Sequence, residues 1–373
     1  MKKSVLLIVL ILSVVGVCRA QATVQGQIVD FVGKNGVQGV KAQASLACTN
    51  PFGQMFTIAQ EAMTDADGKF SVSYPLASGS SCQNRVQSFS LSKTGYSFVE
   101  RKVVNGNSNF WAISEGVPRW VQVSAASYAS AAASEMIVAA FGSDLADSTE
   151  LASTEPLPTR LAGRSVKVTD YAGTEKLAQL FFVSPAQVNL LMPAELEPGP
   201  ALVELDGGNG LIKLSVVTVQ KLSPGIFTAD FTGKGVASGV IVRVFTNGVQ
   251  RYEPIAQFDE TQQKWIPIPI EFTPDTQRIV LALFGTGWRQ VGAFSDVTID
   301  FIAASERNDP LPKRLTSSEY AGKQPTWAGV DQINVEVPRS LIGKGETDVL
   351  VTMRTNPSTG FDFKANRVQI FVK

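Results

Sequence analysis

The side chains available for chemistry in this 373-residue chain do not include histidine, which is absent from the sequence. Histidine is the usual general base near neutral pH and the most common protein ligand of transition metals. Its absence excludes histidine-based catalytic triads and ordinary zinc sites. Catalysis would have to rest on carboxylates, Lys, Tyr or Cys. We expect no catalytic residue, no metal site and no cofactor.

Paired carboxylates are the strongest remaining basis for an enzyme, because glycoside hydrolysis uses two Asp or Glu groups held about 5–10 Å apart across a cleft. The candidate pairs are Asp259 with Glu260 and Asp296 with Asp300. Both pairs lie in strand or loop contexts, where solvated surface charge is the ordinary explanation. A polysaccharide-acting enzyme is therefore the less favoured alternative, since no catalytic motif accompanies these residues.

The N-terminal segment shows the order of features of a secretory signal peptide. Lys2 and Lys3 precede an apolar run over residues 5–17, and a small residue follows at Ala20. The run is short for a bilayer span, and the sequence contains no second one. We expect residues 1–20 to be removed, leaving a mature chain without a membrane span that is secreted, periplasmic or at the cell surface.

The composition limits the partners and the number of domains. Lys and Arg together number 33, as do Asp and Glu, so no overall charge favours a nucleic-acid partner. The 44% content of hydrophobic residues excludes general disorder. The length is too great for one ordinary core and predicts two or three domains.

The cysteines are expected to serve structure. Loss of the signal peptide removes Cys18 and leaves Cys48 and Cys82 in a chain bound for an oxidising compartment, where pairing is the default. Such a bridge would stabilise the domain by roughly 3–4 kcal/mol in the chain-entropy model. The alternative, a reactive thiol, lacks a histidine partner.

The elements that must position all these groups are strands. From Thr23 to about Val104 the sequence consists of short alternating runs broken by Gly, Asn and Asp, which is typical of antiparallel strands. Asp65-Ala66-Asp67-Gly68 favours a hairpin turn between two such runs. The same four residues are only half of a calcium-binding loop and lack its later ligands.

This first region, residues 21–116, resembles the carboxypeptidase-regulatory-like domain, a β-sandwich of the transthyretin or collagen-adhesin B type. The residues that carry the resemblance are Gly26-x-Ile28, Gly36-Val37-x-Gly39-Val40, Thr64-Asp65-x-Asp67-Gly68-Lys69-Phe70 and Thr94-Gly95-Tyr96. The resemblance implies a stalk, adhesion or presenting module without catalysis.

The rest of the chain contains an internal duplication. Gln187-x-Asn189, an apolar alternation and Pro193 recur 145 positions later as Gln332, Asn334 and Pro338. Further ordered matches join Phe141-Gly142 to Phe284-Gly285, Leu157–Leu161 to Leu311–Leu315, and Tyr171-Ala172-Gly173 to Tyr320-Ala321-Gly322. We expect two β-sandwiches in tandem, copy 1 over residues 117–221 and copy 2 over residues 222–373.

The two copies resemble an uncharacterised family of immunoglobulin-like C-terminal domains from exported proteins of acidobacteria. The motifs that carry the resemblance are Ala126-Ser127-Tyr128, Phe141-Gly142-Ser143-x-Leu145-Ala146, Phe182-Val183-Ser184-Pro185-x-Gln187-Val188-Asn189 and Ser223-Pro224-Gly225-Ile226-Phe227-Thr228. In copy 2, Gly329-Val330-Asp331 replaces the Ser-Pro motif. The resemblance implies an all-β fold of tandem sandwiches, one transthyretin-like and two immunoglobulin-like, and assigns no activity.

The repeated amides have two interpretations. In a strand, Val188, Leu190 and Met192 share a core face, so that Gln187 and Asn189 lie on the other face. There we expect their amides to bond the backbone of a neighbouring strand or turn. The alternative makes them a polar ligand-binding pair in each copy.

An insertion in copy 2 carries three aromatic residues among polar ones, Tyr252, Phe258 and Trp265. As an aromatic face of a hairpin they could form a platform for a carbohydrate. We favour the plainer interpretation that Phe258 and Trp265 cover the interdomain core, since exposed aromatic residues are the exception.

The sequence therefore favours an exported, non-catalytic β-sandwich protein that binds carbohydrate or protein at the cell exterior. A structural spacer or assembly subunit of an envelope complex is the alternative that the sequence separates least well from adhesion.

Overall fold

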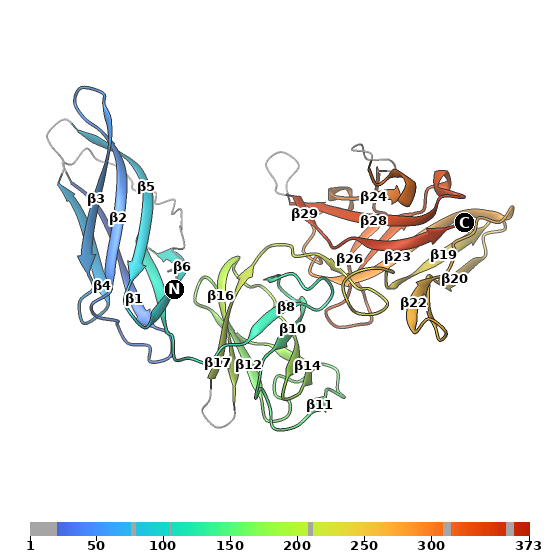
Figure 1. The fold of residues 1–373 in the computed structure, drawn as a ribbon, viewed down its shortest axis with the longest axis horizontal. Coiled ribbons are helices and arrows are strands. Elements are labelled where there is room, and N and C mark those ends of the chain that lie inside the picture. Colours follow the sequence, from blue (N-terminus) through green and yellow to red (C-terminus); the bar gives the residue numbers. More distant parts are fainter. Residues whose placement is uncertain (1–20, 76–79, 105, 208–211, 309–314, 356–361) are drawn as a thin grey trace. The chain divides into compact units, whose positions relative to one another are not determined.

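The computed structural model describes residues 21–75, 80–104, 106–207, 212–308, 315–355 and 362–373 (Figure 1). The predicted signal peptide, residues 1–20, lies outside the described residues. The described part is all-β, as predicted, and its only helices are single 3₁₀ turns: η1 (Phe294–Asp296), η2 (Ala304–Glu306) and η3 (Arg339–Leu341). None of the helices in these ranges has the length and hydrophobicity of a membrane span.

The chain forms two compact units. Of the described residues, the first unit comprises those up to 118 with 171–173, and the second comprises those of 119–170 and 174–373. The second unit therefore contains both repeated copies.

The first unit is a sandwich of two sheets. Its strands are β1 (Gln21–Asp30), β2 (Lys41–Thr49), β3 (Met55–Met63), β4 (Lys69–Pro75), β5 (Ser81–Ser92), β6 (Tyr96–Val104) and β7 (Asn107–Ser114). One sheet has the order β4-β1-β7-β6 and the other β3-β2-β5. Alternate residues of both sheets, such as Ile28 and Val72 in one and Ala44 and Leu46 in the other, share one core, as period-two alternation predicts.

The turn at residues 65–68 is present, but it does not close a hairpin. Asp65 accepts hydrogen bonds from the amides of Asp67 and Lys69 through its Oδ1, at 3.0 and 2.8 Å. However, β3 and β4 on either side belong to different sheets, so the turn passes the chain between the two layers. The hairpin interpretation was wrong. A tight turn reverses the chain locally, but whether the strands on either side of it pair with each other depends on how those strands pack.

Gly68 is required at the end of this turn. Its φ of +74° lies in the left-handed region, and a Cβ there would lie 2.0 Å from the carbonyl oxygen of Ile28. No other residue type could occupy this place without moving the backbone of β1.

The two cysteines that were predicted to pair lie in neighbouring strands of one sheet. Cys48 in β2 is buried and lies directly opposite Cys82 in β5. The side chain of Cys82 lies outside the described residues, so the disulfide stays a prediction that this register supports.

Copy 1 is a second sandwich. Its strands are β8 (Val121–Ser124), β9 (Ala131–Ala132), β10 (Ile137–Phe141), β11 (Glu150–Leu151), β12 (Ser165–Thr169), β13 (Glu175–Leu177), β14 (Gln179–Val183), β15 (Gln187–Leu191), β16 (Gly199–Asp206) and β17 (Ile212–Val219). The sheets have the orders β11-β14-β15-β10-β8 and β13-β12-β16-β17-β9. Val188 and Leu190 from the first and Val166 and Val203 from the second are fully buried in one core.

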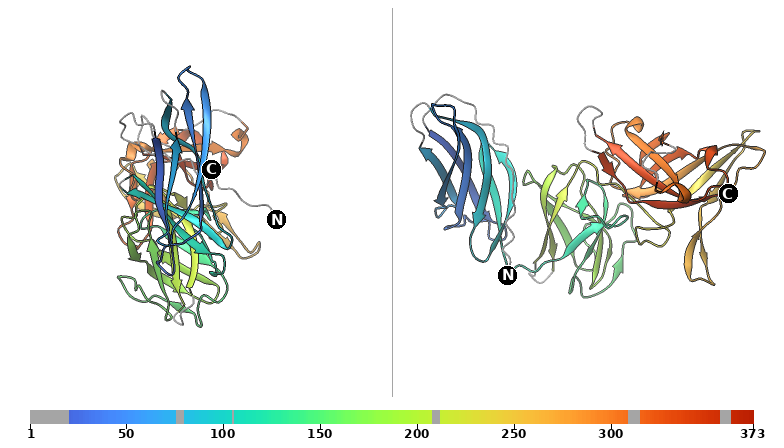
Figure 2. Two further views of the ribbon diagram at one scale, coloured as in Figure 1. Left: turned by 90° about the vertical axis from the view of Figure 1, so that its left-hand side faces the viewer. Right: turned by 45° about the horizontal axis from the view of Figure 1, so that its top comes forward.

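Copy 2 is a third sandwich, with an insertion (Figure 2). Its strands are β18 (Gly225–Ile226), β19 (Gly239–Phe245), β20 (Gln250–Pro254), β21 (Ala256–Asp259), β22 (Lys264–Pro267), β23 (Thr276–Thr286), β24 (Val297–Ala303), β25 (Leu315–Ser317), β26 (Tyr320–Lys323), β27 (Asp331–Glu336), β28 (Gly345–Arg354), β29 (Asp362–Lys364) and β30 (Val368–Val372). The orders are β20-β19-β23-β27-β26 and β25-β24-β28, with β29 and β30 both pairing with β28.

The two copies share their strand order. The run β14-β15-β10 in copy 1 corresponds to β26-β27-β23 in copy 2, and β13-β12-β16-β17 corresponds to β25-β24-β28-β30. The hairpin β21–β22 pairs only with itself among the described strands. The structure thus gives the duplication a topological basis that is independent of the sequence matches.

One sequence match does not mark equivalent positions. Tyr171-Ala172-Gly173 lies in the turn between β12 and β13, whereas Tyr320-Ala321-Gly322 lies in β26. The residue opposite the repeated Asn is Tyr320 in copy 2 and Phe182 in copy 1, so Phe182 is the true counterpart of Tyr320. The match at Leu311–Leu315 falls largely outside the described residues.

Candidate binding surfaces

The repeated amide residues form the same local arrangement in both copies. Gln187 Nε2 donates to Asn189 Oδ1 at 2.8 Å, and Gln332 Nε2 donates to Asn334 Oδ1 at 2.8 Å. Their neighbours in the alternation, such as Val188 and Ile333, are fully buried, as the pattern predicts. The amides lie on the opposite, outer face of the strand and are partly exposed.

The prediction that these amides bond a backbone turn was wrong. The turn before β15 is held by Ser184, whose Oγ accepts the amide N–H of Gln187 at 3.0 Å. The backbone of Ser184 also donates to the carbonyl oxygen of Gln187 at 2.8 Å. Two amides separated by one residue point the same way in a strand, and they bond each other because no closer backbone group faces outward.

Each amide pair is surrounded by the same residue types on the neighbouring strands. In copy 1, Asn189 lies between Ala139 and Phe182, and Gln187 lies opposite Phe141. In copy 2, Asn334 lies between Ala282 and Tyr320, and Gln332 lies opposite Phe284. Side chains directly opposite each other share a face of the sheet. We call these two sets of residues the amide face of copy 1 and the amide face of copy 2.

Copy 2 adds two aromatic rings to its amide face. The Trp327 ring, 53% exposed, meets Phe284 edge to face with ring centroids 5.7 Å apart. The Phe294 ring, 45% exposed, lies 5.4 Å from Tyr320. An aromatic pair therefore stands on each side of Gln332 and Asn334. No sequence motif predicts this, because Trp327 and Phe294 lie outside the segments that match between the copies.

The replacement of the Ser-Pro motif in copy 2 has a clear structural consequence. In copy 1 the backbone N–H of Leu145 donates to the carbonyl oxygen of Pro185 at 2.9 Å. In copy 2 the backbone N–H of Trp288 donates instead to Asp331 Oδ2 at 2.8 Å. Both Leu145 and Trp288 are fully buried. A side-chain carboxylate thus replaces a backbone carbonyl at this loop.

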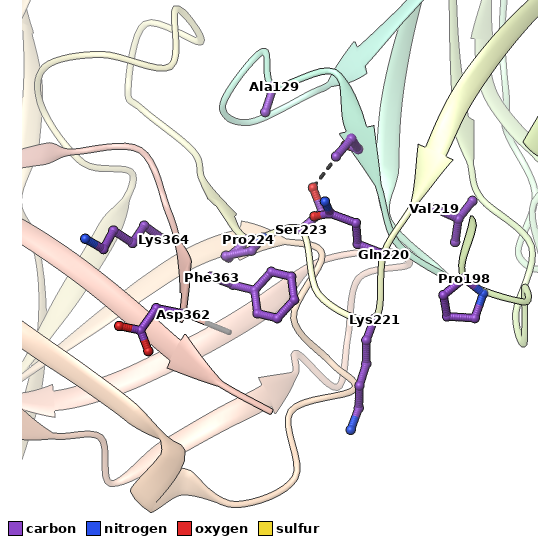
Figure 3. Close-up of a pocket in the computed structure, with 11 residues that line it drawn as sticks. Ala129, Pro198, Val219, Gln220, Lys221, Ser223, Pro224, Asp362, Phe363 and Lys364 are labelled. Atoms are coloured by element: carbon purple, nitrogen blue, oxygen red, sulfur yellow. Dashed lines mark hydrogen bonds between the residues drawn. The ribbon is translucent and has the colours of Figure 1, made fainter. Parts of the chain in front are cut away.

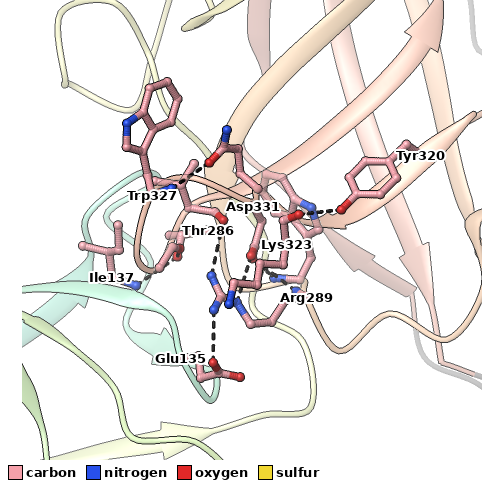
Figure 4. Close-up of polar contacts among 12 residues, drawn as sticks. Glu135, Ile137, Thr286, Arg289, Tyr320, Lys323, Trp327 and Asp331 are labelled. Atoms are coloured by element: carbon pink, nitrogen blue, oxygen red, sulfur yellow. Dashed lines mark hydrogen bonds and ion pairs between the residues drawn. The ribbon is translucent and has the colours of Figure 1, made fainter. Parts of the chain in front are cut away.

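Asp331 also anchors an arginine that joins the two copies (Figure 4). Arg289 Nε donates to Asp331 Oδ1 at 3.0 Å, and its Nη1 donates to Glu135 of copy 1 at 3.1 Å. Asp331 is fully buried, and desolvation raises its pKa to about 6 despite the attraction of Arg289 and two backbone donors.

Backbone contacts reinforce this junction. The amide of Ile137 donates to Thr286 Oγ1 at 2.9 Å, and the Thr286 hydroxyl donates to the carbonyl oxygen of Gly329 at 2.8 Å. A Cβ on Gly329 would lie 2.5 Å from Ile137 and 2.7 Å from Leu191, so copy 2 touches copy 1 here through bare backbone. Gly329, in the segment that replaces the Ser-Pro motif, therefore lets the backbone of copy 2 pack directly against copy 1.

The aromatic residues of the insertion are exposed, which contradicts the favoured prediction that Phe258 and Trp265 cover a core. Phe258 is 45% and Trp265 40% exposed, and the two are direct partners across β21 and β22. Their rings meet edge to face at 5.8 Å. Tyr252 in β20 is 70% exposed and takes part in no ring contact of the described residues.

The base of the insertion is fixed by a charged network. Arg243 in β19 donates to both carboxylate oxygens of Glu253 in β20, at 2.7 and 2.9 Å, and to Thr276 Oγ1 at 3.1 Å. Hydrogen bonding by Arg243 holds the pKa of Glu253 down at about 2. Two parallel bonds of this type fix direction as well as distance, so the strand that leads into the hairpin is rigidly placed.

The carboxylates considered for catalysis have structural or surface positions. Asp259 Oδ1 accepts the amides of Thr261 and Gln262 at 2.8 and 3.0 Å and so closes the β21–β22 turn. Those backbone bonds lower its pKa. Asp296 lies in η1 and Asp300 within β24. Within the described ranges no group of three or more Cys, Asp or Glu side chains could hold a metal ion.

A shallow depression of about 580 Å³ lies where copy 1 passes into copy 2 (Figure 3). Pro198, Pro224 and Phe363 supply its apolar lining. Figure 3 shows the amines of Lys221 and Lys364 directed away from each other. The two lysine amines therefore do not converge on one ligand in the depression.

Comparisons with known proteins leave the family open. No family model matches the chain, and no curated protein does. Among solved structures, the native conformation of the E. coli alpha-2-macroglobulin is 9% identical over 90% of this chain, with a TM-score of 0.17. The chain spans only 18% of that protein. The tetra-tandem repeat in the extending region of a large adhesion protein is 11% identical, over 94% of this chain and 100% of that one, also with a TM-score of 0.17.

Scores of this size carry no argument, so the fold assignment rests on the sheets and cores themselves. The two families named from sequence motifs stay predictions.

Proposed function

We propose that this protein is an exported, non-catalytic binding protein that contacts carbohydrate at the cell exterior through the aromatic hairpin β21–β22. The observation that carries the proposal is the exposed pair of Phe258 and Trp265, directly opposite each other on one face of the hairpin. Aromatic rings suit the apolar faces of sugar rings, because their flat surfaces match and neither partner loses a hydrogen bond.

Rigid placement of the hairpin supports the proposal. The bidentate pair of Arg243 and Glu253 fixes the strand before it, and the Asp259 turn closes its tip. A preorganised platform loses little entropy when it binds, which favours weak, reversible contact with an extended ligand. No residue of β21 or β22 belongs to the buried core of copy 2, so Phe258 and Trp265 are not needed to cover that core.

The test is retention of the mature chain on insoluble polysaccharides. We expect Trp265→Ala and Phe258→Ala each to weaken retention about tenfold or more, as loss of an aromatic anchor does at other interfaces. The control is Phe52→Ala, which removes an 87% exposed ring from the first unit. Retention that is unchanged in both hairpin variants, or equally weakened in the control, would refute the proposal.

A structural spacer is the second candidate. The Glu135–Arg289–Asp331 junction favours it, because it ties two tandem domains together. A spacer would bind no polysaccharide, and the retention experiment therefore separates the two.

A further inference from the structure

We infer that the amide faces of copy 1 and copy 2 are a matched pair of binding sites for a neutral, hydroxyl-rich chain, namely a linear polysaccharide. This inference deepens the proposed function, since it names the ligand class for a second, separate surface. It rests on a juxtaposition that recurs in both copies: an outward amide pair with an aromatic residue across each neighbouring strand.

The first step concerns hydrogen-bonding groups. The bond within each pair uses one N–H of Gln and one lone pair of Asn. The Gln Oε1 and the Asn Nδ2 make no further bond in the described structure. Each face thus offers an acceptor and a donor, side by side and already oriented, and a sugar hydroxyl can serve both because it donates and accepts.

The second step concerns the flanking rings. Phe141 and Phe182 flank the pair in copy 1, and Phe284 and Tyr320 flank it in copy 2. Ala139 and Ala282 occupy the equivalent place beside each Asn, so no long side chain covers the amides from that strand. Polar groups between rings bind a ligand that has both hydroxyl groups and apolar faces, as sugars do.

The third step concerns charge. The residues of the two amide faces include no charged side chain. At the far end of the copy 2 face, Arg278 forms ion pairs with Glu319 at 2.8 Å and with Glu336 at 3.5 Å. Its positive charge is therefore balanced within the protein. A neutral glycan matches this surface, whereas an acidic glycan or a charged peptide would leave its charges without partners.

The fourth step concerns the relation of the two faces. The segment 324–330 reaches both of them. Its Gly329 contacts Ile137 and Leu191, which continue the outer face of copy 1, and its Trp327 packs on Phe284 of copy 2. The junction of Arg289 with Glu135 and Asp331 holds this segment in place. A ligand with repeating units therefore finds the same amide pair and flanking aromatic rings on copy 1 and on copy 2.

The experiment uses the mature chain carrying Phe258→Ala and Trp265→Ala, so that the hairpin contributes nothing. Soluble hexasaccharides of β-1,4-linked glucose, β-1,4-linked mannose and α-1,4-linked glucose are titrated calorimetrically. We expect at least one to bind at two sites per chain. Asn189→Leu and Asn334→Leu should each weaken binding at one site about tenfold or more, and the double variant at both sites, because each site loses the Asn Nδ2 donor and the bond from Gln Nε2 that orients the pair.

Folding is controlled by thermal unfolding of every variant, and Thr298→Val, on a different sheet of copy 2, is the matched substitution. If either leucine variant does not fold, Asn→Asp at the same position keeps the shape and removes the donor. The inference is overturned if no hexasaccharide binds, or if binding survives in folded variants at both positions, which would indicate docking by the apolar residues alone. If the chain with Phe258→Ala and Trp265→Ala binds no hexasaccharide while the natural chain shows hairpin-dependent retention, the inference is overturned and the proposed function stands.

Discussion

Replacing Arg289 by Met removes the guanidinium that joins the two copies and leaves Asp331 buried beside an apolar chain. The side chains of Arg289 and Asp331 are 6% and 0% exposed, so solvent cannot replace the lost partner. Removing one partner of a buried pair typically destabilises by about 3–5 kcal/mol. Asp331 keeps two backbone donors, from Trp288 and Arg289 themselves, which places the expected loss near the lower end, about 3 kcal/mol at pH 7.5.

The same variant should lose less stability in acid. The pKa of Asp331 is about 6 in the folded chain, above its ordinary value of 3.8. The folded state therefore takes up a proton before the unfolded state does, and this group stabilises the fold increasingly as pH falls from about 7 toward 4. A protonated Asp331 no longer attracts Arg289 as an ion, so the difference between Arg289→Met and the natural chain should narrow at pH 5.

The assay is guanidinium chloride unfolding at pH 7.5 and pH 5, followed by tryptophan fluorescence, since Trp288 is fully buried next to the site. Arg278→Met is the control, because the Arg278 side chain is 41% exposed and pairs with Glu319 at the surface. That control should lose no more than about 1 kcal/mol at either pH. A loss below 1 kcal/mol for Arg289→Met at pH 7.5, or an equal loss at both pH values, would refute the reasoning.

Three other outcomes are expected. Gly68→Ala should destabilise the first unit by more than about 2 kcal/mol in thermal unfolding, because the added Cβ would meet the Ile28 carbonyl oxygen. Gly39→Ala should destabilise it by only about 1 kcal/mol, because Gly39 has a φ of +71° but open space where a Cβ would lie. Equal losses for the two variants would contradict this account. Mass spectrometry of the exported chain should show Cys48 and Cys82 in one disulfide-linked peptide pair, and free thiols at both would remove the predicted bridge. Glu253→Gln should lower the melting temperature of the second unit at pH 7 but not near pH 2, because the stabilisation from Glu253, whose pKa is about 2, is present above about pH 4.5 and lost as pH falls through 2.

The fold was largely predictable because alternation with period two depends only on which face of a strand meets a core. Val188, Leu190 and Ile333 therefore lie where the pattern predicts. Strand order was not predictable, since pairing depends on packing between distant segments. The Asp65–Gly68 segment shows this most clearly. Its residue types predict the turn, but they do not predict that the strands on either side of it belong to different sheets.

The binding surfaces were predictable only in part. Gln187 and Asn189 could be identified because their pattern recurs. Whether their side chains bond the backbone or each other depends on side-chain rotamers, which a sequence pattern does not contain. The partners of Asp331 lie at Arg289, 42 residues away, and through it at Glu135, so no local motif could reveal the junction. The sequence feature that points to the junction is Asp331 itself, a charged residue at the start of a buried strand, where copy 1 has Ala186.

The most direct test of the central claim is incubation of the mature chain with insoluble neutral polysaccharides, measuring retained protein and released reducing sugar together. A non-catalytic binding protein should be retained, release no sugar, and be retained more weakly when both Phe258 and Trp265 are replaced by Ala. Release of sugar, or undiminished retention of the double variant, would contradict the account.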